Sequence, residues 1–229
     1  MMKLDARLAA VAAFVPKGSR VADVGTDHGY LAAALVREGR VPFVIASDLP
    51  EGPCEAARRT VREAGLSDRI EVRRGDGLTV LAPGEVDTVC LAGMGGVLMT
   101  QLLAAAPAVV QTLSALVLQP MTGEEELRRD LYAHAWHVAD ETLVVADDRL
   151  YTVILARPGE RPMPDDVTLA VGPVLRDRRD ELLRHHIESQ LFLVRRAAAG
   201  MERSARAKTS AKYRAVQQRI AALEEMLVW

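Results

Sequence analysis

Val21-Ala-Asp-Val-Gly-Thr-Asp-His-Gly-Tyr-Leu31 joins an apolar strand to a helix through a glycine turn. Backbone N–H groups at the start of that helix are unpaired, and Gly25 lets a ligand approach the main chain, as in a nucleotide-type site. Asp27 stands where the dinucleotide fingerprint G-x-G-x-x-G places its second glycine. A carboxylate at that position would repel a pyrophosphate. The stretch therefore favours a cationic or neutral ligand such as S-adenosylmethionine, which carries a sulfonium and an ammonium group.

Strand and helix patterns alternate around this stretch, after an amphipathic helix over residues 4–15. The predicted strands cover residues 20–24, 41–47, 69–73, 87–92, 114–118, 138–146 and 151–156. The predicted helices between them cover residues 29–38, 51–64, 98–110 and 124–133, and Pro107 can break the third. Strands that alternate with helices predict an α/β protein with a doubly wound, mostly parallel, Rossmann-like sheet.

The last two predicted strands differ from the others. Only residues 147–150 separate them, too few for a crossover to a parallel strand, so the pair must form an antiparallel hairpin. A seven-stranded sheet that is closed by such a hairpin is the architecture of class I methyltransferases. A dehydrogenase Rossmann sheet has no reason to end in this way, so the topology favours methyl transfer over hydride transfer.

Acidic residues and glycines follow the predicted strands, where a parallel sheet presents its ligand site. Asp48 ends the second strand, where a carboxylate would accept hydrogen bonds from both ribose hydroxyls. Asp76 follows the third strand and could contact an adenine ring, although it could also be an ordinary turn residue. The glycines of Gly93-Met-Gly-Gly96, after the fourth strand, indicate backbone close to a ligand. The predicted cofactor-binding residues are Asp23, Gly25, Thr26, Asp27, His28, Asp48, Leu49, Asp76, Gly77, Gly93 and Met94.

Five motifs carry a resemblance to a known family. They are VGTDHGYL from Val24, SDLPEGP from Ser47, GDGL from Gly75, AGMGG from Ala92 and LQPMTGE from Leu118. Over about residues 3–157 the chain resembles the bacterial tRNA (adenine-22)-N1-methyltransferase family, the TrmK type. The resemblance implies an S-adenosylmethionine-dependent enzyme that methylates N1 of adenine 22, in the D-arm region of tRNA. Met121 stands where the family pattern has Asn, so a contact of that Asn with the target base would be lost or moved here.

Such a reaction makes few chemical demands on the protein. N1 of neutral adenine can attack a sulfonium methyl group directly, so the enzyme mainly aligns nitrogen, methyl and sulfur. Because N1 lies on the Watson–Crick edge, the base must be unpaired or flipped out. Asp27 is the predicted catalytic carboxylate, which would stabilise the charge on the ring or take the N6 proton. Tyr30, also predicted to be catalytic, would stack on the adenine unless it only packs the helix. Gln119 and Pro120 are predicted to wall the acceptor pocket.

The chain changes character after residue 158. We predict a methyltransferase domain over residues 1–158, a linker over 159–173 and a coiled-coil-like antiparallel helical hairpin over 174–229. Residues 195–214 contain seven basic residues and one acidic residue. A hairpin turn with this charge would bind the phosphate backbone of tRNA, although such a run is also typical of a solvated helix face. The predicted contacts are Arg203, Arg206 and Lys208.

Composition limits the remaining classes. A net charge of −2 on 229 residues gives no overall sign of nucleic-acid binding, so a basic surface must be local. Cys54 and Cys90 have no metal-ligand spacing, and we expect no metal. No signal-peptide pattern and no run of ~18 uncharged apolar residues occurs, so we expect no membrane contact and a cytoplasmic protein, most simply a monomer.

Two other functions stay open from the sequence. One is a methyltransferase for a small molecule or a protein, whose helical hairpin serves dimerisation. The other is a nucleotide-binding protein without catalysis. Methyl incorporation into unmodified tRNA would separate the first alternative from the main prediction, and binding of S-adenosylmethionine would separate the second.

Overall fold

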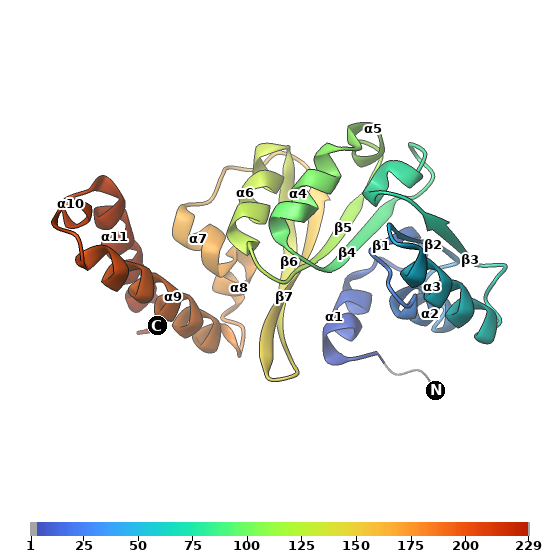
Figure 1. Cartoon of the computed structure of the whole chain (residues 1–229), viewed down its shortest axis with the longest axis horizontal. Coiled ribbons are helices and arrows are strands. Elements are labelled where there is room, and N and C mark those ends of the chain that lie inside the picture. Colours follow the sequence, from blue (N-terminus) through green and yellow to red (C-terminus); the bar gives the residue numbers. More distant parts are fainter. Residues whose placement is uncertain (1–3, 229) are drawn as a thin grey trace. The chain divides into compact units, whose positions relative to one another are not determined.

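A seven-stranded sheet with the order β3-β2-β1-β4-β5-β7-β6 organises the N-terminal part of the protein (Figure 1). The computed structural model describes residues 4–228, and the chain divides between Met163 and Pro164 into two compact units. The strands are β1 Arg20–Val24, β2 Phe43–Asp48, β3 Ile70–Arg74, β4 Thr88–Met94, β5 Ala115–Pro120, β6 Trp136–Ala146 and β7 Arg149–Pro158. Strands β1 to β5 pair in parallel, and β7 runs antiparallel to both β5 and β6. The predicted sheet with its terminal hairpin is confirmed.

Helices cover both faces of this sheet (Figure 1). They are α1 Ala6–Phe14, α2 Tyr30–Arg37, α3 Glu51–Glu63, α4 Gly96–Ala104, α5 Pro107–Val110 and α6 Glu124–Ala133, with a short 3₁₀ helix, η1 Gly77–Val80. Helices α1 and α2 pack on one face, and Figure 1 shows α4 and α6 on the opposite side. Side chains from five neighbouring strands are fully buried in the cluster under α1 and α2: Val44, Val21, Cys90, Val117 and Val153. This cluster holds together the strands whose ends form the site.

The predicted helix over residues 98–110 consists of two helices. Helix α4 ends at Ala104, and Pro107 begins α5 at its first position. Proline fits there because the first helical N–H has no partner within the helix, whereas inside a helix it would remove a hydrogen bond. The predicted break at Pro107 is therefore confirmed.

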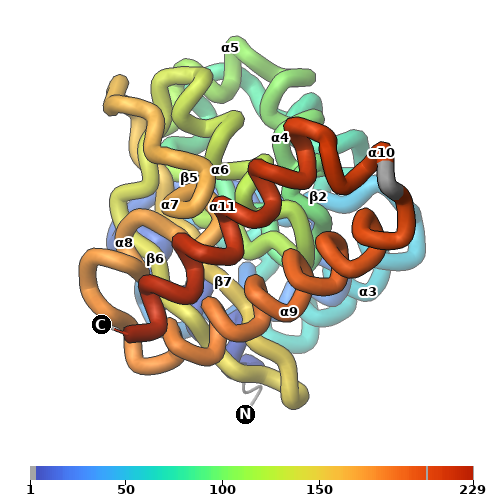
Figure 2. The backbone as a smooth tube through the Cα atoms, turned by 90° about the vertical axis from the view of Figure 1, so that its left-hand side faces the viewer, coloured from blue at the N-terminus to red at the C-terminus, as the bar shows by residue number. Residues whose placement is uncertain are grey.

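The second unit is entirely helical. Its elements are α7 Asp166–Val171, α8 Pro173–Arg178, α9 Leu183–Glu202, α10 Ala205–Lys208 and α11 Ala211–Met226. Helices α9 and α11 run side by side, with α10 in the turn between them (Figure 2). Two contacts fix their antiparallel register: Arg195 Nη2 lies 2.6 Å from Glu224 Oε1, and the Tyr213 hydroxyl donates to Glu202 at 2.7 Å. The predicted helical hairpin is confirmed.

The predicted linker over residues 159–173 is wrong in its second half, because α7 lies within it. Asp165 caps this helix by accepting hydrogen bonds from the N–H and the hydroxyl of Thr168, both at 2.8 Å. Leu169 and Val171 are fully buried. The second unit therefore begins at Pro164, earlier than residue 174. Among residues 4–228, no helix combines the length and the apolar character needed to cross a bilayer.

Candidate functional site

The turn between β1 and α2 has the backbone shape that its sequence indicates. Gly25 and Asp27 have φ values of 77° and 52°, and α2 begins after Gly29, which is also left-handed. The N–H groups of Gly25 and Thr26 both donate to the carbonyl oxygen of Ser47, at 2.9 and 3.0 Å. A Cβ on Gly25 would lie 2.8 Å from Cε of Met94. The turn is thus fixed against the end of β2 and lies in contact with the end of β4.

The buried Asp23 side chain stabilises this turn. The Thr26 hydroxyl donates to Asp23 Oδ2 at 2.6 Å. Burial raises the pKa of the Asp23 carboxyl to about 6 because the charged form loses water, an effect that the Thr26 bond partly offsets. Asp23 and Thr26, both predicted to bind the cofactor, are buried side chains that shape the turn.

Asp48 connects the ends of β1 and β2. Its Oδ2 accepts a hydrogen bond from the Asp27 N–H and its Oδ1 from the Leu49 N–H, both at 2.9 Å. Each carboxylate oxygen has a second lone pair, so Asp48 can still accept from hydroxyl groups of a ligand. The N–H of Gly75 donates to the Asp48 carbonyl oxygen at 3.0 Å, which brings the exposed Asp76 to the same region.

Asp27, His28 and Tyr30 form one exposed group. The Asp27 side chain is 69% exposed, and its Oδ1 lies 3.6 Å from His28 Nε2. The rings of His28 and Tyr30 are stacked, with centroids 5.3 Å apart and an interplanar angle of 13°. Tyr30 is still 42% exposed. The two predicted catalytic residues are therefore linked through His28, and both are open to a ligand.

Gly77 has a packing role that the sequence did not predict. It has a φ of 53°, and a Cβ would lie 2.6 Å from Cδ2 of Leu102 in α4. Gly77 is buried, so its lack of a side chain serves packing against α4 and the tight turn into η1. Its predicted contact with the cofactor stays a prediction beside this packing role.

Gln119 differs from its prediction. Its side chain is fully buried, and its Oε1 accepts hydrogen bonds from Arg7 Nη1 at 2.7 Å and from the Gly93 N–H at 3.1 Å. Pro120 is buried as well. Neither residue lines an open acceptor pocket; Gln119 supports the Gly93 turn from behind. Arg7 was not predicted, because its only signal is a cation in the first turn of an amphipathic helix.

Exposed apolar side chains follow the same strand ends. They are Tyr30 after β1, Leu49 after β2, Val97 and Leu98 after β4, and Met121 after β5. Exposed apolar groups that gather at one edge of a sheet indicate a binding surface. Val97 and Leu98 were missed in the sequence, since at the start of a helix they read as core positions. This edge therefore combines carboxylates with apolar side chains, which suits ligands that carry positive charge and flat rings.

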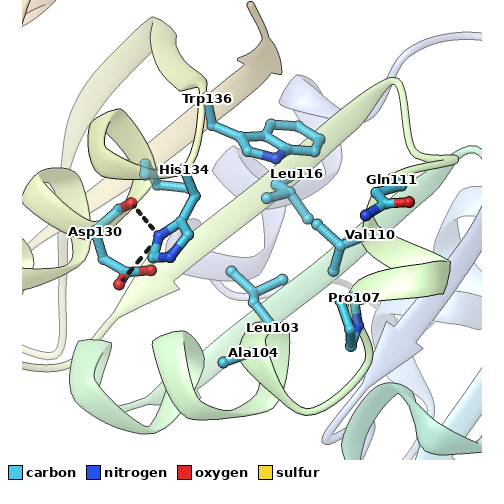
Figure 3. Close-up of a pocket in the computed structure, with 10 residues that line it drawn as sticks. Leu103, Ala104, Pro107, Val110, Gln111, Leu116, Asp130, His134 and Trp136 are labelled. Atoms are coloured by element: carbon cyan, nitrogen blue, oxygen red, sulfur yellow. Dashed lines mark hydrogen bonds and ion pairs between the residues drawn. The ribbon is translucent and has the colours of Figure 1, made fainter. Parts of the chain in front are cut away.

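A hollow of about 210 Å³ lies away from this edge, among α4, α5, β5 and α6 (Figure 3). Leu103, Val110, Leu116 and Trp136 supply apolar walls, and the ring of His134 is bonded to the Asp130 carbonyl oxygen at 2.9 Å. Helices α4 and α6 contribute their C-terminal ends and β5 its amino end. The hollow is therefore separate from the candidate site.

Two further groups of predictions concern metals and the hairpin. Within residues 4–228, no cluster of three or more His, Cys, Asp or Glu side chains is arranged to hold a metal ion. Arg203, Arg206 and Lys208 are exposed and lie at the turn between α9 and α11. The structure thus brings the three predicted tRNA contacts together on one turn.

Comparisons with known proteins agree with this architecture. A family model described as a methyltransferase domain matches residues 4–154. The tRNA (adenine(22)-N(1))-methyltransferase of Bacillus subtilis (strain 168) is 36% identical over 172 residues, which cover 75% of this chain and 72% of that protein. The crystal structure of the B. subtilis m1A22 tRNA methyltransferase TrmK superposes with a TM-score of 0.91 at 29% identity, covering 99% of this chain and 100% of that one. A Streptococcus pneumoniae protein in complex with S-adenosyl-L-methionine gives a TM-score of 0.86 at 27% identity, covering 96% and 98% of the two chains.

Proposed function

Because the chain belongs to the tRNA (adenine(22)-N(1))-methyltransferase family, we propose that it transfers the methyl group of S-adenosylmethionine to N1 of adenine 22 in tRNA. The observation that carries this proposal is the edge of the sheet where carboxylates and apolar side chains meet. Asp27, Asp48 and Asp76 follow three neighbouring parallel strands, and exposed apolar side chains stand among them. This surface matches a cofactor with positive charge beside a flat base.

S-adenosylmethionine, the cofactor, supplies an electrophilic methyl group on a sulfonium centre. The residues present fit it, because the left-handed Gly25 forms a glycine turn beside Asp48, and the Asp48 carboxylate, which accepts two backbone N–H groups, keeps lone pairs for ribose hydroxyls. Asp76 would contact the adenine, and Leu49 would cover it. His28 would either contact the cofactor or orient Asp27, from which it lies 3.6 Å. Met94, in contact with Gly25, would bound the site on the side of β4.

The acceptor base would lie beside Asp27. An exposed carboxylate there would stabilise the positive charge that methylation leaves on the ring, or accept the N6 proton. The Tyr30 ring, which is partly exposed, offers a face for stacking. Val97, Leu98 and Met121 would supply the apolar surface for a base that has left its stack. Met121 offers no amide group for hydrogen bonding, so the edge of the base would be read by other groups.

Mass spectrometry of nucleosides tests the proposal directly. Unmodified tRNA treated with the enzyme and S-adenosylmethionine should gain 1-methyladenosine, and a matched tRNA with guanine at position 22 should gain none. Methylation at another position, or of small metabolites in place of tRNA, would contradict the proposal. The monomeric state and the cytoplasmic location remain predictions, which sedimentation and cell fractionation would test.

A further inference from the structure

Helix α9 exposes an aromatic ring at its middle. The chain contains three phenylalanines, and Phe192 is 66% exposed, with its neighbour Leu193 also open. An aromatic ring buries a large apolar area when it contacts a partner, so a ring as exposed as Phe192 indicates a contact surface. The ring does not belong to the seam between α9 and α11, which is formed by buried side chains such as Leu191 and Leu223.

Phe192 borders a hollow of about 450 Å³ in the second unit. The hollow is lined by Glu188, Leu191, Phe192, Arg195, Arg196 and Leu227. Positions 188, 192, 195 and 196 are three or four residues apart, so these side chains share one face of α9. Arg195 is held at 2.6 Å from Glu224 Oε1, which fixes one cation beside the ring. Glu224 neutralises Arg195, and Glu188 lies 3.5 Å from Arg184 Nη1, so Arg196 supplies the positive charge beside the aromatic wall, which suits a flat group attached to an anion.

Charge indicates which macromolecule such a surface would meet. Residues 195–214 carry seven basic residues and one acidic residue, a net charge of about +6, and they begin at the hollow. A second copy of the same surface would bring like charges together, which opposes self-association. A polyanion with unpaired flat bases has the complementary chemistry.

We propose that Phe192 stacks on an unpaired base of tRNA while Arg196 meets the phosphate beside it. This inference rests on the proposed function and adds a substrate contact outside the predicted turn residues. Base stacking on an aromatic side chain tolerates any base, so the site binds tRNA without reading its sequence. Along α9, Phe192 lies about 16 Å from Arg203, given a rise of 1.5 Å per residue, so the two contacts would hold different parts of the RNA.

Equilibrium binding of unmodified tRNA at several salt concentrations tests the site. Phe192→Ala should weaken binding roughly 5- to 20-fold without changing the salt dependence, because stacking releases no counterions. Phe192→Tyr should restore wild-type binding. Arg196→Gln should lower the slope of log K against log salt by about 0.7, the value for one phosphate of an unpaired strand. Leu193→Ala, an exposed neighbour outside the hollow, is the matched control and should bind like the wild type.

The outcomes separate this inference from the proposed function. Unchanged tRNA affinity in Phe192→Ala, in an enzyme that still methylates adenine 22, would overturn the stacking site alone. A dimer that Phe192→Ala dissociates, with tRNA affinity intact, would assign the ring to a protein interface and also overturn it. Failure of the wild type to methylate tRNA would instead overturn the proposed function. Wild-type thermal unfolding of Phe192→Ala is expected, since the ring is exposed, and would exclude misfolding as the cause of weaker binding.

Discussion

Single side chains give the site its shape. The Asp48 carboxylate accepts two backbone hydrogen bonds, from Asp27 and Leu49, and so fixes the turn after β1 against the end of β2. Gln119 does the same for the irregular backbone at Gly93, near the end of β4, through one oxygen shared by Arg7 and Gly93. In both cases a side-chain oxygen accepts the hydrogen bond of a backbone N–H in an irregular segment. The backbone that carries the exposed Asp27 side chain is therefore held in place.

Asp27 is the residue whose replacement should affect chemistry most. Asp27→Asn keeps the size of the side chain and tolerates the left-handed backbone at φ 52°, so folding should be unaffected. Loss of the carboxylate should lower the rate of methyl transfer by roughly 100-fold, within the range for charge stabilisation or proton transfer. Single-turnover methylation of tRNA measures this rate. Asp147→Asn, another exposed aspartate with positive φ, is the control, and a near wild-type rate in Asp27→Asn would remove Asp27 from catalysis.

The Arg7–Gln119 contact should appear as strong coupling in a double-mutant cycle. Gln119→Glu keeps an acceptor for Arg7 and for the Gly93 N–H, and Arg7 would neutralise the new buried charge. In an Arg7→Met background the same glutamate would lack its cation, which should lower the free energy of unfolding by a further 3 kcal/mol or so. Urea unfolding of the four proteins measures the coupling. Additive effects would show that Arg7 and Gln119 do not act together.

Asp23 should make stability depend on pH. The folded carboxyl keeps its proton up to about pH 6, whereas the reference pKa is 3.8, so between these values the folded state binds more protons. The free energy of unfolding should therefore fall as pH rises through this window, by at most about 3 kcal/mol. Asp23→Asn, which can still accept from Thr26, should lose this contribution. Its stability relative to wild type should rise between about pH 4 and about pH 7.

Chemical denaturation across that pH range measures the difference. Asp148→Asn, at an exposed position, should follow the wild type throughout. Parallel pH profiles for Asp23→Asn and the wild type would contradict a raised pKa at Asp23.

Among the elements, α4 and α6 are joined most closely at the ends that face the site. The Gly96 N–H donates to the Thr122 carbonyl oxygen at 2.7 Å, and Gly96 lies against Gly123. The segments after β4 and β5 are thus held together by a backbone hydrogen bond, with no room for a side chain at Gly96. This contact explains the third glycine of the AGMGG motif by helix packing, in addition to any approach of a ligand.

Replacement of Gly96 tests that packing. A Cβ there would lie 2.3 Å from the Gly123 carbonyl oxygen, which is backbone and cannot turn away. Gly96→Ala should lower the free energy of unfolding by about 1–3 kcal/mol, as overpacking does. Gly200→Ala in α9 is the matched control, because nothing lies within 4 Å of its Cβ position, and it should stabilise by roughly 0.5–1 kcal/mol. Thermal unfolding measures the stability of both variants. Equal effects of the two substitutions would show that Gly96 is not tightly packed.

For the whole molecule, the distribution of charge matters more than its sum. The net charge is −2, while residues 195–214 alone carry about +6. Binding of a polyanion by this segment should therefore depend strongly on salt even though the protein as a whole is slightly acidic. The second unit presents this charge from the middle of α9 through α10 to the start of α11, and the first unit presents carboxylates at its strand ends.

Charge reversal measures the contribution of the turn. Changing Arg203, Arg206 and Lys208 together to Glu should weaken tRNA binding and reduce its salt slope by up to about 3, if each contacts one phosphate. Reversal of Arg37, Arg59 and Arg62, exposed on the C-terminal halves of α2 and α3, is the control of equal charge change. Unchanged affinity in the first variant would make the turn structural.

Much of this architecture could be predicted from the sequence because it depends on local patterns. Alternating strands and helices, the short connection before β7 and the Gly25 turn each follow from residues close together in sequence. The position of Asp27 in the glycine motif was enough to favour a sulfonium ligand over a pyrophosphate. Helix α7 was missed because the surrounding prolines outweighed the single capping signal of Asp165.

Tertiary structure alone assigned the roles of Gln119, Gly77 and Arg7. The Gln119 side chain points to the interior, where it bonds Arg7, which is 112 positions away in sequence. The absence of a side chain at Gly77 leaves room for Leu102, which lies on α4. Whether a residue is buried depends on what packs around it, and a sequence motif does not show which distant element will cover it. Local backbone preferences and hydrophobic periodicity act over a few residues, so they set the elements; contacts between elements then decide which motif residues stay exposed to act on a ligand.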